Sequence, residues 1–171
     1  MMQPGAYDPM AALAVFRSLD PCDLMEAQAI RGMGAGYAQL FAEWHAAQAG
    51  AVLSLVLRWH GQPFALLVLG NTGQAGVAQA AMLARDHTQW RAGIVAAARR
   101  IRQNMPEFCA KAGVHRIEAR AWAGHPRAGH FLRLCGFHVE AIMPGFGASG
   151  GETFQQYAWT ANPKEEDPCV S

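Results

Sequence analysis

One run of residues constrains the fold more than any other. Residues 64–69, FALLVL, are apolar, and turn-forming residues flank them at 60–63 (HGQP) and at 71–76. A strand without polar alternation is typical of the centre of a sheet that is covered on both faces. The run therefore predicts a central strand, and the helical periodicity from about Thr88 onward predicts a long helix packed on it.

The rest of the chain supplies further strands and helices around this centre. Apolar runs and alternation predict strands at residues 11–18, 52–59, 77–85, 115–122, 137–142 and 153–159. Helices are expected after the Asp20-Pro21 cap, over residues 37–48, from Thr88 to Gly113 with a break or restart at Pro106, and from Pro126 to about Gly136. This order predicts an α/β fold with one central mixed sheet and helices on both faces.

Length and composition limit the class of protein. The chain has 171 residues, of which 51% are hydrophobic and 16% charged, so it can bury a core of its own. We expect a flexible lead at 1–10, a single domain at 11–161 and a polar tail at 162–171. The net charge of +1 argues against a dedicated nucleic-acid binder.

The sequence also indicates where the protein works. Its start has no basic segment before an apolar run, and its longest uncharged stretch, 59–84, is interrupted by glycines and a proline, so neither a secretory signal nor a membrane segment is expected. The cysteines, Cys22, Cys109, Cys135 and Cys169, form no C-x-x-C pair. Scattered cysteines favour reduced thiols and a cytoplasmic location.

Two motif matches have simple structural interpretations. Residues 145–150, GFGASG, fit both a dinucleotide-binding pattern and, centred on Ser149, a nucleophile elbow. Both need a helix to follow, and a strand-like segment follows instead, so we expect a hairpin loop. His125, His130, Cys135 and His138 offer zinc-type ligands, but their spacing matches no familiar site, and we expect no metal.

A longer stretch resembles a known family. Residues 112–137, AGVHRIEARAWAGHPRAGHFLRLCGF, resemble the strand and the Gly-Phe-ended helix of the GCN5-related N-acetyltransferases. In that alignment His125 stands where the family often has Asn, Ala128 matches an Ala, and Leu132 replaces the Tyr that is the general acid of many members. The resemblance implies the acyl-CoA N-acyltransferase fold and acetyl transfer from acetyl-CoA to an amine.

The same resemblance implies a cofactor loop before the long helix. The family pattern Arg/Gln-x-x-Gly-x-Gly/Ala falls on Gln89, Ala92 and Ile94, and only Gln89 fits it. Backbone N–H groups at such a helix start bind the pyrophosphate. The implied cofactor-binding residues are Arg85, Gln89, Arg91, Ala92 and Gly93. The candidates for a catalytic base or a related role are Glu118, His87 and His125, with Asp86 as a further alternative.

A narrower resemblance leaves a second function open. The segments LDPCDLMEAQAI, HGQPFALLVLG and RDH, with the 112–137 stretch, are similar in layout to acetyltransferase-like internal virion proteins of podoviruses. One hypothesis is therefore an N-acetyltransferase with a small-molecule or protein amine as acceptor. The alternative is a non-catalytic virion or assembly component of a phage, located in the virion with other virion proteins as partners.

Overall fold

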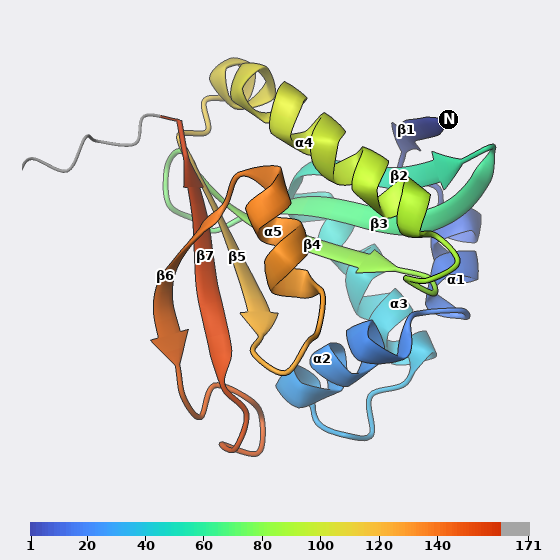
Figure 1. Ribbon diagram of the computed structural model, residues 1–171, viewed down its shortest axis with the longest axis vertical. Helices are drawn as coiled ribbons and strands as arrows, with labels where there is room; N and C mark the ends of the chain where they lie inside the picture. Colours follow the sequence, from blue (N-terminus) through green and yellow to red (C-terminus); the bar gives the residue numbers. More distant parts are fainter. Residues whose placement is uncertain (162–171) are drawn as a thin grey trace, which may run out of the picture.

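The centre of the fold is a seven-stranded mixed sheet with the strand order β1-β2-β3-β4-β5-β7-β6 (Figure 1). The computed structural model describes residues 1–161 of the chain. The strands are β1 (Met2–Ala6), β2 (Ala51–Trp59), β3 (Gln62–Asn71), β4 (Val77–Ala84), β5 (Arg116–Trp122), β6 (His138–Met143) and β7 (Phe154–Thr160). Neighbouring strands are antiparallel except β4 and β5, which are parallel.

Helices cover both faces of this sheet. They are α1 (Pro9–Phe16), α2 (Pro21–Arg31), α3 (Tyr37–Ala46), α4 (Arg91–Ala112) and α5 (Ala128–Cys135), with a short 3-10 turn, η1, at Ala47–Gly50. The helices α4 and α5 share one face, and α1 to α3 lie on the other (Figure 1). The predicted mixed α/β sheet with helices on both faces is confirmed.

The apolar run at residues 64–69 lies inside the sheet, as predicted. It belongs to β3, which pairs with β2 on one side and β4 on the other. Phe64, Ala65 and Leu66 are fully buried. The long helix α4 contacts this strand closely, because a Cβ built on Gly93 would lie 3.1 Å from the Phe64 ring. Glycine at position 93 therefore sets the distance between the helix and the sheet.

The predictions for the first twenty residues are wrong in two places. Residues 11–18 form no strand, because they fall in α1 and in the turn that follows it, where Ala12, Val15 and Phe16 are buried at helical spacing. Asp8 caps this helix by accepting hydrogen bonds from two main-chain N–H groups. The expected flexible lead at 1–10 instead supplies β1, which pairs with β2 at the edge of the sheet, and the first turn of α1.

The long helix also differs from its prediction. It begins at Arg91 and not at Thr88, because the Asp86 carboxylate accepts the N–H groups of Thr88 and Gln89 in a separate turn. Pro106 does not break it. Met105 and Cys109, on either side of the proline, are both buried against the sheet, and this packing holds the helix continuous. Gly113 ends it in a left-handed conformation, as expected.

The remaining elements follow the sequence closely. The short helix α5 begins at Ala128, two residues after the expected start at Pro126. The glycine-rich 145–150 segment joins β6 to β7, which confirms the hairpin interpretation. The expected tail at 162–171 lies outside the described residues. Among the described helices, none has the length and apolarity needed to cross a membrane.

Candidate active site

The two parallel strands at the middle of the sheet separate partway along their length. The ladder between β4 and β5 runs from the pair Val77–Arg116 to the pair Ala80–Ala119 and then stops. Both strands continue beyond this point, β4 to Ala84 and β5 to Trp122. Figure 1 shows them diverging. The last residues of each strand therefore have main-chain groups that the other strand does not satisfy.

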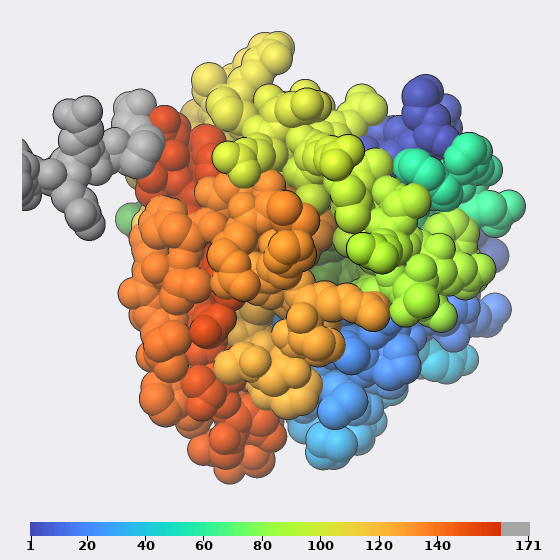
Figure 2. Space-filling model, viewed as in Figure 1, coloured from blue at the N-terminus to red at the C-terminus, as the bar shows by residue number. Residues whose placement is uncertain are grey.

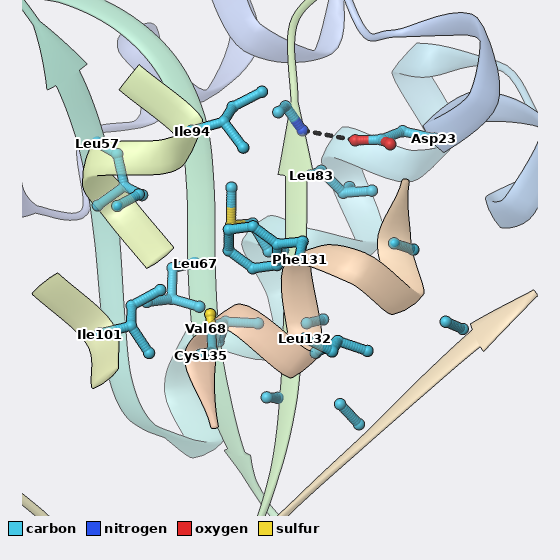
Figure 3. Close-up of a pocket in the computed structure, with 18 of the residues that line it drawn as sticks. Asp23, Leu57, Leu67, Val68, Leu83, Ile94, Ile101, Phe131, Leu132 and Cys135 are labelled. Carbon is cyan, nitrogen blue, oxygen red and sulfur yellow. Dashed lines mark hydrogen bonds between the residues drawn. The ribbon is translucent and has the colours of Figure 1, made fainter. Parts of the chain in front are cut away.

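Helix α2 places carboxylates against the ends of both separated strands. Asp23 Oδ2 accepts the N–H of Ala84 in β4 at 2.7 Å, drawn as a dashed line in Figure 3. Glu26 Oε2 accepts the N–H of Trp122 in β5 at 3.2 Å. Residues three apart share one face of a helix, so Asp23 and Glu26 reach the two strands from the same side of α2. The helix thus bridges the opening that the strands leave.

Two histidines meet at Asp23. His87, from the β4–α4 connection, and His125, from the β5–α5 connection, each place Nε2 3.0 Å from Asp23 Oδ1. Asp20 also faces this group, because its Oδ2 accepts the His87 N–H at 2.8 Å and lies 3.6 Å from His87 Nδ1. All four residues are buried. We call Asp20, Asp23, Glu26, His87 and His125 the histidine–carboxylate cluster.

The hydrogen bonds of His125 determine where its proton lies. Its Nδ1 accepts the main-chain N–H groups of Arg127 at 3.1 Å and Ala128 at 3.0 Å, at the start of α5. Nδ1 must therefore carry the lone pair, and the neutral ring carries its proton on Nε2, which donates to Asp23. His125 thus acts as a side-chain cap for α5, at the position where the family resemblance places an Asn.

The pKa values of the two carboxyl groups of α2, Asp23 and Glu26, are shifted in opposite directions. Burial would raise the pKa of Asp23, but the hydrogen bonds from His125, His87 and Ala84 outweigh burial and hold the pKa below its ordinary value. Burial dominates at Glu26, where the nearby histidines and the Trp122 N–H compensate only in part. The pKa of Glu26 is raised to about 7. Asp23 is therefore a stable anion, while Glu26 exchanges its proton near neutral pH.

The cluster does not fit a metal ion. Asp23, His87 and His125 each offer one ligand atom, and these atoms lie within 4.8 Å of one another. A metal needs a lone pair on the histidine nitrogen that faces it. At His125 that nitrogen is Nε2, which carries the proton because Nδ1 accepts two N–H groups. Within residues 1–161, the sequence neighbours His125, His130, Cys135 and His138 form no ligand group together. The absence of a metal stays a prediction.

A large apolar cavity lies next to the cluster. Its volume is about 1050 Å³, and its lining includes Asp23, Glu26, His87 and His125. Figure 3 shows its apolar wall, which β2, β3, α4 and α5 build from Leu57, Leu67, Ile94, Ile101, Phe131 and Leu132. The surface is hollowed between α4 and α5 (Figure 2). An elongated ligand with an apolar arm could therefore reach the cluster from this side.

The start of α4 offers main-chain donors beside the cavity. The N–H groups of Arg91, Ala92 and Gly93 have no hydrogen-bond acceptor within the described residues. The side chains of Gln89, Arg91 and Arg99 surround a smaller hollow at this end of the helix. Free N–H groups, the positive end of the helix dipole and arginine side chains together favour an anion.

One predicted cofactor residue points elsewhere. Arg85 donates from Nη1 to the carbonyl of Pro63 at 3.1 Å, and its guanidinium lies 5.1 Å from the centre of the Trp90 ring. It therefore braces the β4–α4 connection from outside the cavity. The carboxylate of the exposed Asp86 already accepts hydrogen bonds from the main-chain N–H groups of Gln89 and Thr88. These hydrogen bonds lower the pKa of its carboxyl group.

The predicted catalytic residues separate into two places. His87 and His125 come together at Asp23, although 38 positions separate them in the sequence. Glu118 lies elsewhere: its β5 neighbours Ile117 and Ala119 face α4 and α5, so its own side chain faces the opposite side of the sheet. There its carboxylate accepts a hydrogen bond from Arg116 Nε at 2.8 Å.

Sequence reasoning missed the functional acids of α2. In the sequence, Asp23 and Glu26 look like ordinary acids in the early turns of a helix, where they favour the helix dipole, and Asp20 is the expected cap of that helix. The capping role of Asp20 is confirmed, because its Oδ1 accepts the Cys22 N–H at 2.9 Å. The spacing of three between these acids is the available signal, since it places them on one helix face. Nothing in that spacing indicates that the face is buried against separated strands.

Comparison with known proteins identifies the fold. No family model and no curated protein matches the sequence. Among solved structures, yncA of Salmonella typhimurium, solved with its cofactor acetyl-CoA, is 16% identical, covers 98% of this chain and 99% of its own, and has a TM-score of 0.65. The ribosomal-protein-S18-alanine N-acetyltransferase of Escherichia coli is 15% identical over 99% of this chain and 100% of its own, with a TM-score of 0.66.

A third solved structure binds a different acceptor. The spermidine N-acetyltransferase of Vibrio cholerae, in complex with CoA and spermine, is 11% identical over 94% of this chain and 95% of its own, with a TM-score of 0.68. These proteins share the fold, and the acceptors named for the second and the third differ. The chain therefore has the fold of the GCN5-related N-acetyltransferases.

Proposed function

We propose that the protein is an N-acyltransferase that moves an acetyl group from acetyl-CoA to an amine. The observation that carries this proposal is the opening between β4 and β5, with the histidine–carboxylate cluster at its mouth and a large apolar cavity beside it. Acyl transfer needs an amine and a thioester held together and a group that removes a proton. The opening offers space for the amine and the thioester, and titratable side chains that could remove the proton.

The residues present fit acetyl-CoA at the start of α4. The free N–H groups of Arg91, Ala92 and Gly93 would hold the pyrophosphate, and the Arg91 guanidinium would add positive charge. The apolar cavity between α4, α5 and the sheet would hold the less polar arm of the ligand. Because the connection lacks two glycines of the family pattern, its backbone approaches phosphate less closely, and we expect weak binding.

The position of the family tyrosine holds no proton donor in this chain. Leu132 lines the cavity at that position and has no proton to donate. Thiols have a pKa of about 8.5, so the departing thiolate can take its proton from water. Removal of a proton from the amine is then the step for which the protein must supply a group.

Calorimetric titration with acetyl-CoA tests the proposal. Wild type should bind, Arg91→Ala should bind about tenfold more weakly through the loss of one charge-assisted contact, and Gly93→Val should bind weakest. Glu107→Gln, an exposed change on the far part of α4, is the matched control and should bind as wild type does. Affinity that survives both Arg91→Ala and Gly93→Val would refute the location.

The alternative makes the opposite prediction. A non-catalytic virion or assembly component needs no acetyl-CoA, so wild type would not bind it at millimolar concentration. The departures at Ile94 and Leu132 from the family pattern are what keep this alternative open. Binding together with release of free CoA in the presence of an amine would rule it out.

A further inference from the structure

We infer that Glu26 is the residue that removes the proton from the incoming amine. This inference rests on the acyl transfer proposed above and names the base for it. Glu26 was not among the sequence-based candidates, which are Glu118, His87 and His125, with Asp86 as a further alternative. A base needs a lone pair that can face the substrate, and the members of the histidine–carboxylate cluster differ in this respect.

Neither histidine has a lone pair that can face a substrate. The Nδ1 lone pair of His125 is used by the N–H groups of Arg127 and Ala128, and its Nε2 proton is donated to Asp23. At His87, Nε2 faces Asp23 Oδ1 and Nδ1 faces Asp20 Oδ2, so carboxylates occupy both directions. The ring nitrogens of both histidines therefore face carboxylates or main-chain N–H groups and do not face the cavity.

The carboxylate oxygens of Asp20 and Asp23 also already accept hydrogen bonds. Asp23 accepts three hydrogen bonds, from His87, His125 and the Ala84 N–H, which is close to the capacity of a carboxylate. Asp20 uses one oxygen to cap α2 at Cys22 and the other for the His87 N–H. These four side chains form a closed arrangement whose structural role is to hold the ends of β4, α2 and α5 together.

Glu26 is the exception. Only its Oε2 is engaged, by the Trp122 N–H, and its Oε1 has no partner among residues 1–161. The side chain lines the cavity at the open ends of β4 and β5. The titratable groups around it are Asp23 on its own helix, His87 from the β4–α4 connection and His125 from the β5–α5 connection. Burial raises the pKa of Glu26 to about 7, which suits a base at neutral pH.

The chemical step balances with this assignment. The amine arrives as an ammonium ion and gives one proton to Glu26 Oε1, which leaves a lone pair on nitrogen. That nitrogen attacks the thioester carbon, the N–C bond forms and the C–S bond breaks. The second proton leaves nitrogen and, through water, accounts for the proton on the released CoA thiol. Glu26 returns its proton to solvent, so the net products are the amide, CoA-SH and one proton.

The test combines titration of Glu26 with turnover. Protein carrying ¹³C at the glutamate side-chain carboxyls should show one signal that titrates near pH 7 and is missing from Glu26→Gln. With n-butylammonium chloride as the cation probe, that signal should titrate at lower pH, because a bound positive charge favours the carboxylate. A signal that titrates near pH 4.5 and ignores the cation would overturn the inference, whatever the turnover.

Turnover separates this inference from the proposed function. CoA release from acetyl-CoA is measured from pH 6 to 9 with n-butylamine and an alanine-terminated peptide as acceptors. Glu26→Gln should bind acetyl-CoA as wild type does but release CoA at least about a hundredfold more slowly. Glu26→Asp should regain part of the lost rate. The control Glu140→Gln should keep the wild-type dependence of rate on pH. A Glu26→Gln rate equal to wild type, or a loss found instead in Glu118→Gln, would overturn the inference. Absence of acetyl-CoA binding by wild type would instead refute the proposed function.

Discussion

The start of α4 and the histidine–carboxylate cluster are both polar sites, and they are built in opposite ways. At the start of α4 the N–H groups of Arg91, Ala92 and Gly93 have no partner within the described chain. In the cluster, nearly every polar atom is matched across four segments of the chain, and Glu26 Oε1 is the exception. The first region is suited to receive a ligand. The second is already organised and also supports the fold.

The comparison predicts the largest effect at Asp23. Asp23→Asn keeps the shape but replaces the charge that His87, His125 and the Ala84 N–H all face. Removal of one charged member of a buried network costs about 3 kcal/mol of unfolding free energy. We expect that loss in urea unfolding, together with loss of CoA release. A matched change at the α4 start, Arg91→Ala, should leave the unfolding free energy within about 0.5 kcal/mol; equal losses in the two variants would break the comparison.

The second effect is a pH dependence that comes from Glu26. Its pKa is about 7 in the folded protein, against about 4.3 in an unfolded chain. The folded state therefore binds more protons between these values, and stability should fall as pH rises from about 4.5 to 7, by about 2.7 kcal/mol. Chemical unfolding at a series of pH values measures this. Glu26→Gln should remove most of the decline, and an unchanged slope in that variant would contradict the assignment.

A smaller effect separates the two roles of His125. His125→Ala should lose both the cap of α5 and the bond to Asp23, whereas His125→Asn can still cap the helix through its side-chain oxygen. The two variants should therefore differ by about 1 kcal/mol in thermal or urea unfolding. Equal stability of the two variants would mean that the Nδ1 contacts contribute nothing.

The smallest effect is expected on the face of the sheet opposite α4 and α5. Glu118 and Arg116 form a partly exposed ion pair there, with Glu140 as a second acceptor for Arg116. Such pairs contribute about 0.5 kcal/mol. Glu118→Gln should change unfolding free energy by no more than that, and CoA release should stay near the wild-type rate. A large loss of rate would return Glu118 to the candidate bases.

The two halves of the sheet show what periodicity could and could not predict. The uninterrupted apolar run in β3 predicted an interior strand, because both faces of that strand are covered. Alternation in β5 predicted one covered face, and its polar residues do face away from α4 and α5. Residues 11–16 belong to α1 because Asp8 and Pro9 start a helix there, a local signal that a short apolar run obscures.

The candidate site was predictable only in part for a similar reason. His125 lies in the 112–137 segment that resembles the acetyltransferases, and His87 lies between a predicted strand and the long helix, where the family has its cofactor loop. Both could therefore be named from the sequence. Asp23 and Glu26 look like ordinary first-turn acids of α2. Their role depends on where β4 and β5 separate, which is a property of long-range pairing. No local pattern in the sequence encodes that position.

The central claim is that the opening between β4 and β5 is an acyl-transfer site. A crystal structure of the wild-type protein with CoA tests it most directly. We predict the pyrophosphate on the N–H groups of Arg91, Ala92 and Gly93, and the thiol in the cavity between the separated strands, close to Glu26. Pyrophosphate bound elsewhere, or a site that stays empty at millimolar CoA, would contradict this account.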